Sequence, residues 1–327
     1  MKSLMIYGAT GYTGRLAVEQ AVASGLPVLL AGRGREALID LAGRFDLPYR
    51  VFDLADEAAI DAAFKEVAAI LNCAGPFLRT AGPLMRAALR NGVDYLDIAA
   101  ELDSYRLAEV LEEEAREAGV MLLPGGGGSV AMLGCLAGHA ARRVEDPQTV
   151  RVALHVSGAM SRGSAVSAAE SVTTETFIRS HGRLVPRPDA ERVLFDFGDG
   201  PAPCFPVTLP DLITIGRSTG AANVETFVHV SGAAFPEGDL AALPDGPNAE
   251  ERASHPYQAA VEVVGCDGAT ARSILHTVNG YTFTPMAAAE AARRVLAGTR
   301  RAGFQTPAEL FGDDFIEGFP ETRLLDL

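Results

Sequence analysis

A glycine-rich turn stands at the start of the sequence, directly after a short apolar run. It reads GATGYTG, and its candidate ligand contacts are Gly8, Thr10, Gly11, Tyr12, Thr13 and Gly14. Small residues let a backbone approach a pyrophosphate, and the N-terminus of the following helix offers free N–H groups and a positive potential. Because the turn follows a strand signal and opens a helix, it predicts a dinucleotide site. A tight turn without a ligand is the alternative.

The residues at the end of the second apolar run indicate which dinucleotide binds. NAD sites usually carry an acidic residue there for the ribose 2′-hydroxyl, whereas this chain has Arg33. A guanidinium pairs with a 2′-phosphate and stacks on adenine, so the sequence predicts NADP (NADPH). A solvated cation at a helix start is the alternative. Asp53, after the third run, is a candidate partner for the adenine amino group or, nearly equally, a helix N-cap.

A third candidate segment follows the fourth apolar run. It comprises Cys73, Ala74, Gly75, Pro76 and Phe77. In a doubly wound sheet this strand end lies near the nicotinamide ribose, where small residues leave room for the dinucleotide. No base can be assigned to Cys73 from the sequence, so a small packed residue is a better interpretation than a nucleophile.

Candidate proton-transfer residues are a further group. The cofactor itself carries out hydride transfer, whereas the protein must orient the nicotinamide and supply or accept a proton. Neither Lys2 nor Lys65 lies four residues after a tyrosine, which excludes the Tyr-x-x-x-Lys pair of the short-chain dehydrogenases. The remaining candidates are Asp97, Glu101, His155, His276 and Tyr281. We favour Glu101, beyond the fifth strand, with capping of the next helix as its alternative. For His155 and Tyr281 the alternative is packing.

Serines beside an arginine mark a candidate substrate contact. Ser161, Arg162 and Ser164 precede a helical stretch, and hydroxyls, a guanidinium and a helix N-terminus together suit a carboxylate. An amino or keto acid substrate is one hypothesis, and a plain turn with an N-cap is the other. Ser129, after a run of four glycines, is a further substrate-side candidate.

Alternating strand and helix signals position these candidates over the first 125 residues. Strands are expected at 4–7, 28–31, 49–52, 68–71, 95–98 and 120–123. Helices are expected between them, at 13–24, 35–45, 57–64, 83–90 and 103–118. The alternation predicts right-handed βαβ units and a Rossmann doubly wound parallel sheet.

After about residue 145 the pattern changes. Strands are expected at 150–156, 192–197, 212–215, 224–231, 259–264 and 272–278, with helices at 172–181 and 286–296. An exposed loop, with room for one short helix, is expected over 236–257, and an irregular tail from 303. This pattern predicts a second α+β domain built on a mixed, mostly antiparallel sheet. We predict an NADP-binding Rossmann domain at 1–145, to which the chain returns at 280–327, and a substrate-binding and dimerisation domain at 146–279.

Composition bounds the class of protein. The chain has 327 residues, which suits two domains, and its net charge of −14 disfavours nucleic acid and anionic lipid as partners. The longest uncharged stretch, 119–141, contains Pro124 and four glycines, which a membrane span would not. The cysteines and histidines show no paired spacing, so neither disulfides nor a metal site is expected. With no signal peptide visible, a cytoplasmic location fits best.

The motifs taken together resemble those of the saccharopine dehydrogenase-like oxidoreductases, including their trans-acting enoyl reductase branch. The residues that carry the resemblance are Gly8–Gly14, Ala31–Arg33, Cys73–Phe77, Asp94–Asp97 with Glu101, Pro124–Gly127 and Gly303–Ala308. The resemblance implies a Rossmann domain joined to a mixed-sheet domain, a late return of the chain to the first domain, and a nicotinamide-dependent redox step. The resemblance does not identify the substrate, because the segment 128–133 lacks the Asp and Pro that family members often carry there.

These observations predict an NADP-dependent oxidoreductase that transfers a hydride between nicotinamide and a C=N, C=C or C=O bond of a small molecule. A homodimer is expected, because an antiparallel sheet can pair across a two-fold axis. Two alternatives stay open. One is a non-catalytic NADP-binding sensor, and the other is a redox-neutral epimerase or lyase with a bound cofactor.

Overall fold

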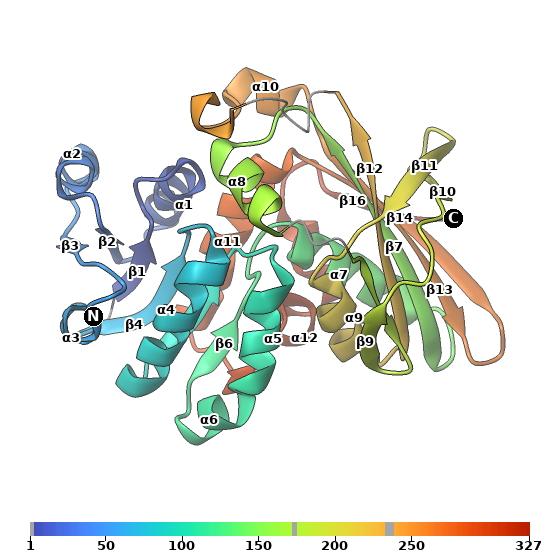
Figure 1. The fold of residues 1–327 in the computed structure, drawn as a ribbon, viewed down its shortest axis with the longest axis horizontal. Helices are drawn as coiled ribbons and strands as arrows, with labels where there is room; N and C mark the ends of the chain where they lie inside the picture. Colours follow the sequence, from blue (N-terminus) through green and yellow to red (C-terminus); the bar gives the residue numbers. More distant parts are fainter. Residues whose placement is uncertain (1–2, 172–174, 233–238) are drawn as a thin grey trace. The chain divides into compact units, whose positions relative to one another are not determined.

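The computed structural model describes residues 3–171, 175–232 and 239–327. The chain divides into two compact units, each assembled from two stretches of sequence (Figure 1). Unit 1 comprises Met1–Gly128 and Thr284–Gln305, and unit 2 comprises Ser129–Phe283 and Thr306–Leu327. This division differs from the boundaries predicted from the sequence, because residues 129–145 and the C-terminal segment from Thr306 are part of unit 2.

Unit 1 is built on a seven-stranded sheet in the order β15-β6-β5-β4-β1-β2-β3, with all neighbouring strands parallel. The strands are β1 Ser3–Tyr7, β2 Val28–Gly32, β3 Tyr49–Val51, β4 Val67–Asn72, β5 Asp94–Asp97, β6 Met121–Leu123 and β15 Gly303–Phe304. The short central runs are almost fully buried, as expected where helices cover both faces of a parallel sheet. The predicted doubly wound sheet is therefore confirmed.

The register of the central strands brings their carboxyl ends level with one another. Tyr7 of β1 pairs with Ala31 of β2 and with Asn72 of β4, and Asn72 pairs in turn with Asp97 of β5. Ligands of open α/β sheets bind beyond the carboxyl ends of the strands. The segments singled out in the sequence therefore meet at one edge of this sheet.

Helices connect the strands of unit 1. They are α1 Tyr12–Ala23, α2 Arg35–Phe45, α3 Glu57–Ala63, α4 Phe77–Asn91, α5 Leu102–Val110, α6 Glu112–Glu117 and, from Thr284 on, α11 Gly280–Leu296. The single helix expected at 103–118 is two helices, since the backbone at Leu111 leaves helical geometry. Helix α4 begins six residues earlier than expected and contains Pro83 in its first turns.

Unit 2 is built on a nine-stranded sheet in which β10-β11-β12-β7-β13-β14-β16 form the main path and β8 and β9 branch from β12. Its strands are β7 Pro147–Ser157, β8 Phe177–Ser180, β9 Arg183–Pro186, β10 Val193–Asp196, β11 Pro201–Pro206, β12 Asn223–Ser231, β13 Tyr257–Gly265, β14 Thr270–Thr277 and β16 Arg323–Asp326. Strands β12 and β7 are parallel, and the other neighbours are antiparallel. The predicted mixed, mostly antiparallel sheet is confirmed.

The helical segments of unit 2 are α7 Ser129–Ala141, α8 Arg162–Ser171, α9 Asp211–Thr219, α10 Ala249–Ala253 and α12 Pro307–Phe311, with 3₁₀ turns η1 Leu240–Ala242 and η2 Asp313–Gly318. Helix α7 is apolar on every side and packs against α9, α12, η2 and the sheet. Such a helix belongs in a core. The hairpin β10–β11 brings Phe195, Phe197 and Cys204 onto Ala153 and Phe227 in a second buried cluster.

Three sequence predictions in unit 2 are wrong. Residues 212–215 belong to helix α9 rather than a strand, because a short apolar run fits a buried helix as well as a buried strand. The helix expected at 172–181 lies partly outside the described residues, and 177–180 form strand β8. The tail from 303 is regular, since it supplies β15 to unit 1 and α12, η2 and β16 to unit 2.

Within residues 3–171, 175–232 and 239–327, no helix combines the length and the apolar character needed to cross a membrane. The same residues contain no cluster of three or more histidine, cysteine or acidic side chains arranged to hold a metal ion.

Candidate functional site

The glycine turn between β1 and α1 is closed by contacts that side chains would prevent. The Gly11 N–H donates to the Gly8 carbonyl over 3.0 Å, and Gly8 has a φ of +79°. A Cβ on Gly14 would lie 2.1 Å from the Gly8 oxygen. No side chain caps the N-terminus of α1 at Gly11. A helix N-terminus of this kind can receive a phosphate.

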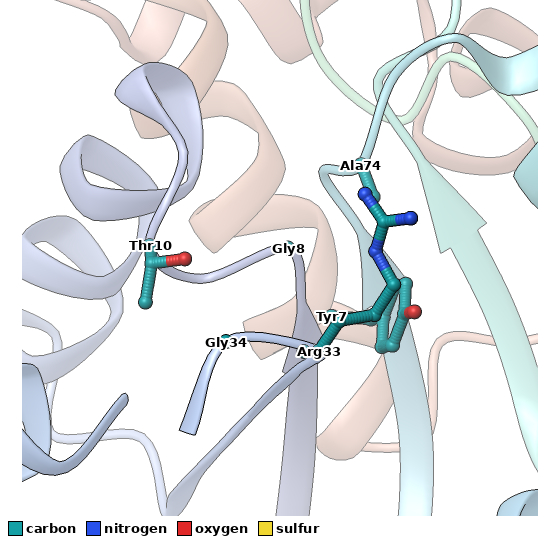
Figure 2. A pocket seen from close by; sticks show the side chains of 7 residues that line it. Tyr7, Gly8, Thr10, Arg33, Gly34 and Ala74 are labelled. Carbon is teal, nitrogen blue, oxygen red and sulfur yellow. The ribbon is translucent and has the colours of Figure 1, made fainter. Parts of the chain in front are cut away.

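A cavity of about 460 Å³ opens beside this turn in unit 1 (Figure 2). It is lined by Tyr7, Gly8, Thr10, Gly32, Arg33, Gly34 and Ala74. Four of these seven residues are cofactor contacts predicted from the sequence. Gly32 and Gly34 flank a predicted residue, whereas Tyr7 was missed; its one local signal is an aromatic side chain on the last strand residue before the glycine turn.

Arg33 lies directly after β2 and carries the positive charge of the cavity. Burial raises the pKa of Tyr7 to about 12, while the Arg33 charge opposes this shift and the Asp53 charge adds to it. The Asp53 carboxylate accepts a hydrogen bond from the Ala55 N–H at 2.9 Å, and the N-cap of α3 is Asp56 instead. The N-cap alternative for Asp53 is therefore wrong, and its proximity to adenine stays a prediction.

Nine predicted cofactor residues lie outside the lining of this cavity. They are Gly11, Tyr12, Thr13, Gly14, Asp53, Cys73, Gly75, Pro76 and Phe77. Phe77 is the first residue of α4 and is buried. The Cys73 N–H donates to the Tyr7 carbonyl at 2.8 Å, and burial, with the Asp97 charge, raises the pKa of the Cys73 thiol to about 12. A thiol that holds its proton is a poor nucleophile, which favours the packing interpretation of Cys73.

A buried polar network runs from β5 to the cavity wall. The Asn72 amide donates to the Tyr95 hydroxyl at 3.2 Å, and its carbonyl accepts from the Ala74 N–H at 3.0 Å. Thr80 donates to the Ala74 carbonyl at 2.6 Å. Both backbone groups of Ala74 are thus held, which fixes the loop that lines the cavity.

Asp97 ends β5 and joins this network to the turn after β6. Its carboxylate accepts from the Gly125 N–H at 2.7 Å and the Ala99 N–H at 2.9 Å. Burial raises the pKa of Asp97 to about 6, although these two hydrogen bonds act to lower it. The Glu101 charge adds to the rise. Glu101 directly precedes α5 without capping it through its side chain. Two carboxyl groups thus lie near each other at the sheet edge, and an acid–base role for Glu101 stays a prediction.

Three residues predicted to act on the substrate come together in unit 2. The Ser161 N–H donates to the Tyr281 hydroxyl at 2.8 Å, and that hydroxyl donates to Ser164 Oγ at 2.9 Å. Ser161 Oγ also donates to Ser164 Oγ, at 3.0 Å. Arg162 points elsewhere, since it pairs with Asp245 and donates to the Leu243 carbonyl. Ser129 is the first residue of α7.

The histidine candidates stand in a row across the unit 2 sheet. His155 pairs in register with His229 on one side and with Gln258 on the other, and Gln258 pairs with His276. Both ring nitrogens of His155 are engaged, one by Gln258 and one by Ser231, each at 2.8 Å. Burial lowers the pKa of His155. These contacts favour packing, and a catalytic role for His155 stays a prediction.

Comparison with known proteins finds similarity to one family over the N-terminal part of the chain. Residues 4–123 match the model of the saccharopine dehydrogenase NADP-binding domain. A human saccharopine dehydrogenase-like oxidoreductase is 31% identical over 144 residues, which cover 38% of this chain and 34% of that protein. A trans-acting enoyl reductase of Mycobacterium leprae (strain TN) is 32% identical over 106 residues, 30% of this chain and 25% of that protein.

The fold has a solved counterpart over the whole chain. Apo saccharopine dehydrogenase (L-Glu forming) from Saccharomyces cerevisiae superposes with a TM-score of 0.65 at 12% identity, and the match covers 100% of both chains. The curated relatives, in contrast, are matched over about a third of their length or less. Residues 4–123 are therefore similar to the saccharopine dehydrogenase NADP-binding domain, and the predicted resemblance of the chain to the saccharopine dehydrogenase-like oxidoreductases is confirmed.

Proposed function

We propose that the protein is an NADP(H)-dependent oxidoreductase that transfers a hydride between nicotinamide and a C=N, C=C or C=O bond of a small molecule. The observation that carries the proposal is the position of the Arg33 guanidinium in a cavity formed by the glycine turn and the β4 loop. When bound, the cofactor supplies the hydride chemistry, and the protein supplies binding, orientation and proton handling.

The lining of the cavity favours the phosphorylated dinucleotide. Among its lining residues Arg33 is the charged one, and none is acidic. A guanidinium pairs with a phosphate through two parallel N–H donors, whereas a carboxylate in that place would repel it. The uncapped N-terminus of α1 would hold the pyrophosphate, since it joins free N–H groups to the positive end of the helix dipole.

Ser164 supports an oxygen-bearing substrate in unit 2. Its Oγ accepts from both Tyr281 and Ser161, so its own proton is left for a further acceptor. A carbonyl or carboxylate oxygen of the substrate is the acceptor that we propose, which includes amino and keto acids. Because Asp245 already holds the Arg162 guanidinium, we base this part of the proposal on the hydroxyl cluster.

The experiment is a fluorescence titration of the protein with NADPH and, separately, with NADH. We expect NADPH to bind at least about tenfold more tightly, which is about 1.4 kcal/mol. Arg33→Ala should remove most of this preference. Arg35→Ala is the matched control, because Arg35 is an exposed arginine two residues away on α2 and does not line the cavity. Equal affinities in the unmodified protein would overturn the NADP assignment.

Two other functions would give different results. A non-catalytic NADP sensor would bind NADPH with the same preference, yet would oxidise none of it with a panel of keto acids, imines and enoyl compounds. A redox-neutral epimerase or lyase would keep its dinucleotide through purification and return it unchanged after turnover. Steady oxidation of NADPH with one substrate class separates our proposal from both.

We also propose that the protein acts in the cytoplasm as a homodimer formed through the unit 2 sheet. Leu194 of β10 and Phe205 of β11 are 65% and 43% exposed on that sheet, which offers apolar area to a second copy. For the compartment, the support is that all four cysteines are free thiols, which suits a reducing cytoplasm. Light scattering of the purified protein would give twice the chain mass of 34.3 kDa for a dimer, and Leu194→Asp should shift it to the monomer.

A further inference from the structure

Tyr7 is a residue of the cofactor cavity to which the sequence assigned no role. It is the last residue of β1, and its ring packs on Phe52 with the ring centroids 5.0 Å apart. The residue is 2% exposed, yet it lines the cavity together with Arg33 and Ala74. Figure 2 shows its ring and the Arg33 side chain on neighbouring strand ends.

The Tyr7 hydroxyl has no hydrogen bond to another residue in the described part of the chain. The hydroxyl oxygen is not sealed in the core, because Tyr7 lines the cavity and its oxygen is open to it. With its raised pKa the phenol keeps its proton at neutral pH and is therefore a donor. It can therefore donate a hydrogen bond to an acceptor bound in the cavity.

The surrounding charges indicate what kind of acceptor this is. Arg33 lies close enough to lower the pKa of Tyr7, so an anion bound there would meet a cation and an O–H donor together. The Asp53 carboxylate carries the opposite charge and also acts on Tyr7, since it raises the pKa of the phenol. Because that carboxylate repels an anion, the guanidinium needs a second donor to hold a phosphate firmly.

We propose that the Tyr7 hydroxyl donates a hydrogen bond to the 2′-phosphate of NADP(H) and, with Arg33, determines the choice of cofactor. This inference rests on the function proposed above. A hydrogen bond to an ionised acceptor is about twice as strong as one between neutral groups. The contact therefore favours NADPH over NADH, whose 2′-hydroxyl is neutral.

The test is Tyr7→Phe, which removes the hydroxyl and keeps the ring that packs on Phe52. We expect NADPH to bind about tenfold more weakly, as for a lost charge-assisted hydrogen bond of roughly 1.5 kcal/mol. NADH affinity should change less than twofold. Tyr49→Phe, on β3 and outside the cavity lining, is the matched control and should leave both affinities unchanged.

Nucleotide fragments separate a phosphate contact from a contact with adenine or ribose. Competition by 2′,5′-ADP should weaken in Tyr7→Phe, whereas competition by 5′-AMP should not. An equal loss for both fragments, or for neither, overturns the inference. A thermal melt of each variant confirms folding, and the double variant with Arg33→Ala should show a smaller Tyr7→Phe effect than the single variant.

The outcomes also separate this inference from the proposed function. If the unmodified protein prefers NADPH and Tyr7→Phe has no effect on that preference, the role of Tyr7 fails and the oxidoreductase proposal stands. If the unmodified protein binds neither dinucleotide, the proposed function itself fails, and this inference fails with it.

Discussion

The Tyr95 hydroxyl donates a hydrogen bond to the Asp97 carboxylate two residues further along β5, over 2.8 Å. Residues two apart on a strand share a face, so both side chains point into the same buried layer. From there Asn72 carries the hydrogen bonds on to Ala74, which lines the cofactor cavity. The end of β5 is thus linked to the cofactor site through side chains that do not line the cavity.

Removing the Tyr95 hydroxyl should therefore affect both stability and cofactor binding. In Tyr95→Phe the buried Asp97 carboxylate loses a donor and the Asn72 amide loses an acceptor, so we expect about 1–3 kcal/mol of destabilisation. Because Ala74 is then held less firmly, NADPH should bind a few fold more weakly. Denaturant unfolding and the fluorescence titration measure the two effects. Unchanged stability would contradict the network described here.

A second prediction concerns Arg300, which lies in unit 1 just after α11. Arg300 donates to both carboxylate oxygens of Asp94, at 2.5 and 2.7 Å, and Asp94 is buried and also accepts from the Met121 N–H. Arg300→Ala removes the charge partner of that carboxylate, so we expect a loss of about 2–3 kcal/mol in the free energy of unfolding.

Arg293→Ala is the matched control for this prediction. Arg293 pairs with Glu290 on the surface of α11, its side chain is half exposed, and Arg294 also holds the same glutamate. Exposed ion pairs contribute about 0–1 kcal/mol. Chemical denaturation measures the free energy of unfolding of both variants. If Arg300→Ala lost no more of it than Arg293→Ala, the buried Asp94 carboxylate would not need Arg300 as its charge partner.

The position of the candidate cofactor site was predictable because its signals are local in the sequence. The glycine turn and Arg33 each sit at a strand end, and the parallel sheet brings strand ends to one edge. Tyr7 was missed since an aromatic residue at the end of a buried strand looks like core. Its role depends on the hydroxyl lacking a partner, and no sequence pattern reports that.

Unit 2 was less predictable because its contacts join distant segments. The hydroxyl cluster links Ser164 to Tyr281, which are 117 positions apart, so no spacing could show that these residues meet. Helix α9 was mistaken for a strand because four apolar residues carry no period. Its limits are set by Pro210 and by Gly220, which adopts a φ of +77° and ends the helix.

A third prediction concerns Asp211, in the first turn of α9. This residue is fully buried, and neither of its carboxylate oxygens has a hydrogen-bond partner in another described residue. Burial raises the pKa of Asp211 from 3.8 to about 7. Between these two values the folded protein holds a proton that the unfolded chain has lost. Stability from this group is therefore complete below about pH 4 and declines as the pH rises to about 7.

Asp211→Asn tests this dependence because the amide carries no charge at any of these pH values. In the unmodified protein the free energy of unfolding should fall, relative to the variant, by up to about 1.4 kcal/mol per pH unit between pH 4 and 7, and then level off. Asp40→Asn, on the exposed side of α2, is the control and should follow the unmodified protein. Urea unfolding at four pH values measures the slope. Parallel curves for the unmodified protein and Asp211→Asn would mean that Asp211 has the same pKa in the folded protein as in the unfolded chain, which would contradict the rise expected from its burial.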